Sequence, residues 1–236
     1  TELETDIPAD ERYLSVRADQ IARLSPRSLA VLEIRHPRDL EVLEKIYAGS
    51  VLLGDDSEEG WGIKYAREFD MTNDSHLFAP RPEWEAKGYR PDEYGRWVGP
   101  EGEVALPLVQ GGMLSGFDFS QKGWLSGTGL RAVWREIDWQ DKRVEPQFLV
   151  PESACSTPGI RSIKPAVRRI ARNTDSRMLI SGLVPALPCG DVASVVQPRN
   201  HALVEVLVVV LNSPPADLAV RARCGGTHVD WHYLAE

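Results

Sequence analysis

Apolar side chains recur every three or four positions near the N-terminus, which predicts an amphipathic helix over residues 38–47. Pro37 directly precedes this pattern and suits the first turn of a helix. Residues 13–24 show a weaker apolar pattern that fits either a helix or a strand. Residues 29–34 (LAVLEI) predict a short strand, and the polar residues 1–12 are expected to be frayed.

The middle of the chain alternates short apolar runs with segments rich in glycine and proline. Residues 79–102 hold many prolines, glycines and charged residues, a composition that predicts a long mobile surface loop. The glycine-rich residues 111–129 are interpreted as a hairpin or loop with buried aromatic side chains. Strands are expected at residues 104–108, 130–137 and 147–150.

The last third of the chain has the strongest periodicity. Residues 162–172 are predicted to form a helix with Pro165 in its first turn. Residues 200–211 fit a helix or a long buried strand, and a helix is favoured because Asn200 can cap it. A strand at 178–184 and a helix at 216–223 complete the pattern. The mixture indicates an α+β fold, a mixed sheet with packed helices.

A chain of 236 residues can form one large domain or two small ones. The N-terminal 60 residues are interpreted as an acidic connector region and residues 61–236 as the main region, or the two as one continuous domain. No apolar run approaches the roughly 18 residues that a membrane span needs. Three scattered cysteines do not suggest a disulfide framework, so a cytoplasmic location is expected.

The net charge of −8 is unevenly distributed. Residues 1–60 carry −7, residues 61–150 carry −3, and residues 151–236 carry +2. Exposed charges are screened beyond about 8–10 Å, so a basic surface can coexist with an acidic body. The composition therefore argues against a protein that coats nucleic acid without specificity, but it permits a local nucleic-acid contact.

Six basic residues fall between positions 161 and 177, against the single acid Asp175. On the predicted helix Arg168 and Arg172 are four residues apart and share a face. Arginines on one face can bind phosphate or the edge of guanine. The alternatives are a solvated helix face, or an Arg177 that binds carbonyl groups inside the fold.

Two other segments carry candidate chemistry. Small and polar side chains within 111–129 suit close contact with a DNA groove, and the candidates are Ser120, Gln121 and Lys122. The motif HVDWH at 228–232 would place three metal ligands on one face of a strand, although an ordinary edge strand is the simpler interpretation. A nuclease motif around residues 74–87 lacks the apolar strand that its chemistry requires.

Five segments spread over the chain are informative together: residues 25–47, 61–78 (WGIKYAREFDMTNDSHLF), 106–119, 168–185 and 211–234. In combination they resemble the target-recognition region of type IIG-like and phage-defence N-6 adenine DNA methyltransferases. Val109, Gln110 and Gly111 depart from the family's usual Tyr-Glu-Gly, and Arg169 replaces an acidic residue. The resemblance implies a target-recognition-domain-like fold that binds double-stranded DNA. Taken together with the candidates from the basic segment and the glycine-rich segment, the expected DNA-binding residues are Arg168, Arg169, Arg172, Arg177, Ser120, Gln121, Lys122 and Thr227.

The sequence contains neither the glycine loop that binds S-adenosylmethionine nor the Asn-Pro-Pro-Tyr type tetrapeptide of these enzymes. We therefore expect the chain to be non-catalytic by itself, with no cofactor of its own. The resemblance implies that a separate methyltransferase domain binds S-adenosylmethionine and is the second partner. The alternative function is a protein-interaction or scaffold module of the same enzyme that does not contact DNA.

Overall fold

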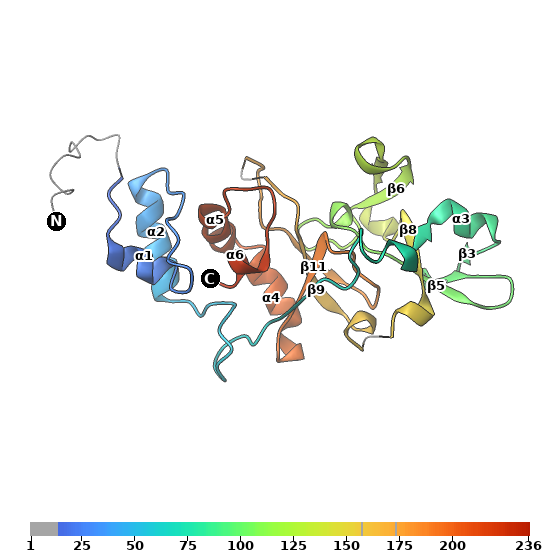
Figure 1. Cartoon of the computed structure of the whole chain (residues 1–236), viewed down its shortest axis with the longest axis horizontal. Coiled ribbons are helices and arrows are strands. Elements are labelled where there is room, and N and C mark those ends of the chain that lie inside the picture. The colour runs from blue at the N-terminus through green and yellow to red at the C-terminus, as the bar shows by residue number, and fades with distance from the viewer. Residues whose placement is uncertain (1–13, 157, 173) are drawn as a thin grey trace.

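The computed structural model describes residues 14–156, 158–172 and 174–236. Its elements form an elongated body, with helices α1 and α2 at one end, a central sheet covered by helices, and a second sheet at the other end (Figure 1). The chain combines helices with antiparallel sheets, so the α+β prediction is confirmed. Within the described part, parallel pairing is confined to the isolated bridges Phe69↔Gly190 and Val109↔Cys189.

A four-stranded sheet occupies the centre of the molecule. Its order is β1 (Lys64–Ala66), β11 (Ala193–Gln197), β9 (Lys164–Arg168) and β10 (Ser181–Val184). All neighbours are antiparallel, and the register pairs Arg168 with Ala193 and Val167 with Ser181. The ends of β1 and β9 therefore lie beside the beginnings of β10 and β11, at one end of the sheet that we call the sheet end.

Helices cover this sheet with an apolar core. They are α4 (Val204–Leu211), α5 (Pro214–Arg223) and the short α6 (Trp231–Leu234). Leu207 and Leu211 of α4 are fully buried against Val167 and Met178. Asn200 accepts a hydrogen bond from the Ala202 N–H and Asn212 follows the last turn of α4, so the helical interpretation of this segment is confirmed.

The second sheet has five strands in the order β2-β8-β5-β4-β3, and a separate hairpin pairs β6 with β7. Leu106 and Leu149 are buried in this unit. The strands are β2 (Ala79–Pro80), β3 (Arg90–Pro91), β4 (Trp97–Val98), β5 (Val104–Pro107), β6 (Lys122–Ser126), β7 (Val133–Glu136) and β8 (Phe148–Pro151). Short 3-10 helices at 75–77, 111–113, 129–131, 139–141, 152–154, 158–161 and 201–203 connect the elements.

The loop predicted at 79–102 is wrong as a structural assignment. The segment contains β2, α3 (Arg81–Ala86), β3 and β4, and Trp84 and Trp97 are buried in a common cluster with Leu149. The Trp84 indole donates to the Ala79 carbonyl at 3.2 Å. Pro82 lies in the first turn of α3, where proline is tolerated. The prolines of this segment are therefore compatible with regular secondary structure.

The helix predicted at 162–172 is also wrong, because the segment forms strand β9 and then an irregular chain. Lys164 to Val167 are buried on both faces of the sheet, and such a continuous buried run is typical of a central strand. Pro165 lies near the beginning of β9, where its missing N–H costs least. Arg168 and Arg172 therefore do not share a helix face.

The N-terminal helices α1 (Ala18–Leu24) and α2 (Pro37–Ala48) pack on α5 through Leu43 and Ala222. Pro37 is in the first turn of α2, as predicted, and His36 caps it. Residues 29–34 form no strand, so the strand predicted there is wrong. Residues 1–13 lie outside the described part of the chain, so the expected fraying of residues 1–12 stays a prediction.

One buried ion pair joins β9 to the segment that follows β1. Lys164 is fully buried and its ammonium donates to both carboxylate oxygens of Glu68, at 2.7 and 2.9 Å. It also donates to the carbonyls of Gly159 and Ile160. Glu68 accepts a further hydrogen bond from the Cys189 N–H at 2.9 Å. Every charge is thus compensated, as a buried ion pair requires.

Removing one partner of this pair should be much worse than removing both. Lys164→Met leaves a buried carboxylate without its counter-charge, and should lower the free energy of unfolding by about 3–5 kcal/mol. The double variant Glu68→Gln/Lys164→Met should recover a large part of this loss, because no isolated charge remains. Urea unfolding of the three proteins measures both values. Equal stability of the single and double variants would contradict the assignment.

Candidate functional site

The sheet end gathers the basic residues that the sequence singles out. Arg67 directly follows β1, and Arg168 and Arg169 lie at the end of β9. The chain then continues through Arg172 to Arg177 before β10. Thr227 lies beside this segment, because its carbonyl accepts the Ala171 N–H at 3.1 Å. Four of the predicted arginines are thus neighbours in the sequence, and the fold adds Thr227 to them.

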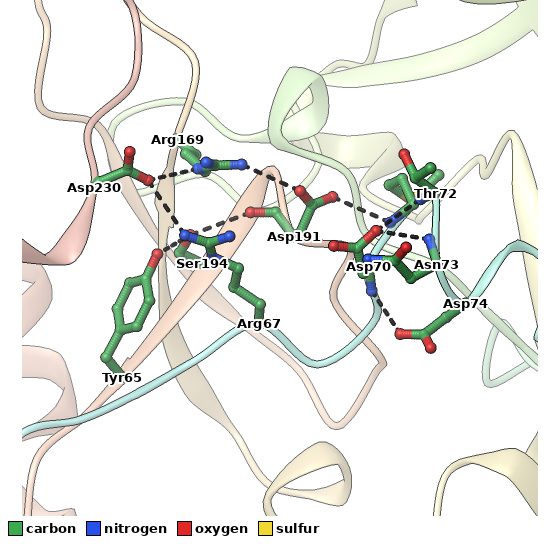
Figure 2. A network of polar contacts seen from close by, with 11 residues as sticks. Tyr65, Arg67, Asp70, Thr72, Asn73, Asp74, Arg169, Asp191, Ser194 and Asp230 are labelled. Carbon is green, nitrogen blue, oxygen red and sulfur yellow. Dashed lines mark hydrogen bonds and ion pairs between the residues drawn. The ribbon is translucent and has the colours of Figure 1, made fainter.

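Arg169 is locked in an ion-pair network (Figure 2). Its Nε donates to Asp230 at 2.7 Å and one terminal nitrogen donates to Asp191 at 3.2 Å. Arg67 lies 3.6 Å from the same Asp230 carboxylate. Only 17% of the Arg169 side chain is exposed. Sequence reasoning treats Arg169 as a free cation, whereas here it joins β9 to the C-terminal segment and to the turn before β11.

The network continues into the loop after β1 (Figure 2). Asp191 accepts the Met71 N–H at 3.3 Å. Asp70 accepts the N–H groups of Asn73 and Thr72, at 2.8 and 2.9 Å, and these bonds hold the pKa of Asp70 below its ordinary value. Its own N–H donates to Asp74 at 2.8 Å. Residues 70–74 therefore build a turn, and this turn is fixed to Arg169 through Asp191.

The neighbouring arginines stabilise the ionised form of the Asp230 carboxyl group. Burial alone would raise the pKa of this carboxyl, but the hydrogen bond and charge of Arg169, with the charges of Arg67 and His232, outweigh burial. The pKa of Asp230 therefore lies below its ordinary value. A lowered carboxyl pKa contributes stability above the unfolded-state pKa, and this contribution is lost as the pH falls through the folded-state value.

Arg169→Ala should therefore destabilise the fold in a pH-dependent way. The loss should be about 2 kcal/mol near neutral pH, below the cost for a fully buried pair because both side chains keep some exposure. The difference from the wild type should shrink as the pH falls below about 4, where the carboxyls become neutral. Denaturation at pH 7, 5 and 3 measures it. A constant difference, or one no larger than that of the exposed Arg172→Ala control, would contradict the network.

A cleft of about 480 Å³ opens on the same sheet end. Arg168, Arg177, Asn212 and Phe117 contribute to its walls, with Leu179 and Ile180 also lining it. The cleft therefore joins two guanidinium groups and an aromatic ring to a lining that is partly apolar and partly polar, and that includes Asp175. Such a mixture can hold a ligand that has both a flat apolar face and a negative charge.

Arg177 is used by the fold. One of its terminal nitrogens donates to the carbonyls of Asn212 and Ser213, at 2.6 and 3.3 Å, beyond the end of α4. Its Nε lies 3.7 Å from Asp217, whose carboxylate accepts the N–H groups of Met178 and Leu179. The interpretation that Arg177 binds carbonyl groups inside the fold is confirmed.

Arg168 and Arg172 keep their terminal groups available. Arg168 uses only its Nε, which donates to the Ile170 carbonyl at 3.0 Å. Arg172 is exposed, and its backbone N–H donates to Asp175. In the described part of the chain, neither guanidinium forms an ion pair with a carboxylate. These two arginines are therefore the cations at the sheet end that an external anion can reach.

The candidates at 120–122 occupy a different setting. Ser120 is fully buried and donates its hydroxyl to the Arg143 carbonyl, so its side chain faces the interior. Gln121 and Lys122 are half-buried at the start of the β6–β7 hairpin, where Lys122 lies opposite Glu136. The metal interpretation of HVDWH is not supported, because residues 231–234 form α6 and the described residues contain no group of three metal ligands.

Phe117 is the residue that sequence reasoning missed. Its side chain is 54% exposed at the rim of the cleft, whereas the hairpin interpretation buries it. Its φ is 64°, in the left-handed region that residues other than glycine rarely adopt. Trp124 of the same hairpin is buried, as expected. The preceding Gly116 signals a turn, but nothing in the sequence signals the unusual conformation at Phe117 itself.

The backbone conformation at Phe117 should reverse the usual order of stability of the alanine and glycine variants. At ordinary positions glycine is less stable than alanine by about 0.5–1 kcal/mol. At a positive φ we expect Phe117→Gly to be more stable than Phe117→Ala by about 1 kcal/mol, because only alanine retains the steric conflict. Thermal unfolding of both variants measures the difference. An alanine variant as stable as the glycine variant would show that the turn is not strained.

In the part of the chain that the structure describes, no single helix is long and apolar enough to cross a membrane. The segments 201–211 and 214–223 together reach that length and composition, but they bend by 72°. No profile of a known protein family matches the chain, and no curated protein matches it significantly.

Proposed function

We propose that this chain is the DNA-recognition portion of a larger N-6 adenine DNA methyltransferase, non-catalytic by itself, and that duplex DNA contacts the sheet end. The observation that carries the proposal is the contrast among neighbouring arginines. Arg169 and Arg177 are bound within the fold, while Arg168 and Arg172 present unpaired guanidinium groups to solvent. A cation that the fold does not use internally, beside a polar cleft, suits an external anion.

Phosphate is the anion that this arrangement fits best. Guanidinium groups bind phosphate oxygens through two parallel hydrogen bonds, and hydroxyl groups commonly add further phosphate contacts. Thr227 is exposed beside the Arg172 segment and can supply such a hydroxyl. Arg168 lies in the wall of the cleft, where it can also reach a base edge.

The larger cleft of about 720 Å³ on the second sheet is a weaker candidate, although Arg81, Arg135 and Arg143 line it. Arg135 and Arg143 both pair with Glu145. Arg81 lies 3.4 Å from Glu85 and stacks over Trp124. Three of its arginines therefore lie close to carboxylates of the same unit, whereas the exposed Arg90, which also lines this cleft, donates only to the carbonyls of Glu85 and Tyr89.

Methyl transfer belongs to the separate domain that this proposal requires. S-adenosylmethionine would supply the methyl group there, and this chain contributes position and sequence preference. Arg169 and the turn at residues 70–74 would act indirectly, by holding the segment that carries Arg168 and Arg172 in place.

A scaffold function is the second candidate, and a specific feature favours it. Val31 and Val51 are 77% and 50% exposed near the acidic N-terminal helices. An apolar cleft of about 210 Å³ lies between this region and the helices α4 and α5. Exposed apolar residues around a cleft are typical of protein contacts. In this case the N-terminal region would bind another domain and DNA would not touch the sheet end.

The DNA proposal predicts a change in the salt dependence of binding. Each phosphate contact that is removed should lower the slope of log affinity against log salt by about one unit. Arg168→Ala and Arg172→Ala should each do so, while Arg143→Ala should not, because Arg143 is exposed but paired with Glu145. Fluorescence anisotropy with labelled 30-bp duplexes at several salt concentrations measures the slopes.

Folding of each variant is checked by thermal unfolding, since none of these three side chains is buried. If Arg168→Ala and Arg172→Ala leave both affinity and slope unchanged, the sheet end is a solvated surface. If the wild type binds none of the duplexes at low salt, the scaffold function is the better account.

A further inference from the structure

Phe117 combines three properties that ordinary surface phenylalanines do not share. It is more than half exposed, it has a φ of 64°, and it stands at the rim of a cleft that contains Arg168. An unfavourable backbone conformation persists only where the surrounding structure enforces it. The surroundings of Phe117 therefore indicate whether its exposure is fixed or incidental.

The turn that carries Phe117 is held on both sides. The Phe117 N–H donates to the Ser181 carbonyl of β10 at 2.9 Å, and Ser115 and Asp118 exchange backbone hydrogen bonds around it. Asp118 is buried, accepts the Ser120 N–H at 2.9 Å and pairs with Lys142 at 2.6 Å. A buried ion pair next to an exposed ring fixes the ring's position outside the core.

The polar groups of the cleft are unequally available. The side chain of Asn212 is occupied, since it accepts from Ser181 and donates to Ser181 and Val208. Arg177 is bound to carbonyl groups. The terminal nitrogens of Arg168 have no hydrogen-bond partner in the described part of the chain. Asp175 also lines the cleft, and its carboxylate accepts the Arg172 N–H. The cleft thus offers an aromatic residue and one free guanidinium group, with one carboxylate in its wall.

We propose that this cleft receives one unstacked DNA base, which stacks on Phe117 while a flanking phosphate binds Arg168. A nucleotide is flat and apolar on its faces and carries a negative charge next to them, which matches this pair of side chains. The cleft volume of about 480 Å³ lies in the usual range for small-ligand sites. Base stacking on an aromatic ring tolerates any base, so this contact would not by itself choose a sequence. The inference rests on the proposed DNA function.

The test compares two DNA probes that differ in one base. The first is a labelled 20-bp duplex with a single unpaired 2-aminopurine, and the second contains the same base in a normal pair. The wild-type chain should bind the unpaired probe more tightly, because its base is already free to leave the stack. Its 2-aminopurine fluorescence should fall on binding, since stacking on a ring quenches it.

Phe117→Ala should weaken binding of the unpaired probe about tenfold and abolish the fluorescence change. Binding of the paired probe should change less than about twofold. Phe117→Trp should restore the preference, whereas Phe117→Leu, which keeps apolar bulk without an aromatic face, should not. Arg168→Ala should weaken both probes, because it removes a phosphate contact that they share.

The outcomes separate this inference from the proposed function. If Phe117→Ala folds and binds both probes like the wild type, while Arg168→Ala still weakens them, base stacking is overturned and DNA recognition stands. If Phe117→Leu is as effective as Phe117→Trp, the cleft holds an apolar group of another kind and the inference fails. If the wild type binds neither probe, both proposals fail.

Discussion

The fork formed by Arg169 between Asp230 and Asp191 organises the sheet end. These three residues come from the end of β9, the C-terminal segment and the turn before β11, and Asp191 extends the contact to Met71. Partly buried charges are stable only when they are compensated, so the fork constrains all four segments at once. The segment that follows Arg169 leaves the sheet from a fixed point. The positions of Arg168, Arg172 and Thr227 depend on this constraint.

The same constraint explains how a protein with a negative net charge can bind the proposed anionic partner. Most arginines near the sheet end are compensated internally by carboxylates or carbonyls, as Arg169 and Arg177 show. At the sheet end, Arg168 and Arg172 are available to an external anion, and Arg168 lines the cleft. Such a surface would position DNA through a small number of contacts rather than attract it along its whole length. The interpretation agrees with a portion of a larger enzyme whose other domain adds further contacts.

Local signals in the sequence were sufficient for the helices with clear ends. Pro37 marks the first turn of α2, and Asn200 caps the 3-10 turn that leads into α4. The helix predicted at 216–223 is observed as α5, which begins two residues earlier at Pro214. Segment 162–172 was misassigned because arginines four residues apart fit a helix as well as a loop after a strand. Only the pairing of β9 with β10 and β11 distinguishes a strand followed by a loop from a helix in this segment. This pairing involves residues outside the segment and is not visible in its local sequence.

The site was predictable in composition but not in detail. The cluster of arginines is visible in the sequence, whereas the partner of Arg169 lies 61 residues away and follows from tertiary structure alone. The exposure of Phe117 depends on a backbone conformation that no local pattern encodes. The most direct test of the account is hydrogen exchange of the whole chain with and without a mixture of 30-bp duplexes. The account predicts slower exchange at residues 115–117, 168–177 and 225–229 and no change at 85–95, whereas protection confined to residues 29–53, or none at all, would contradict it.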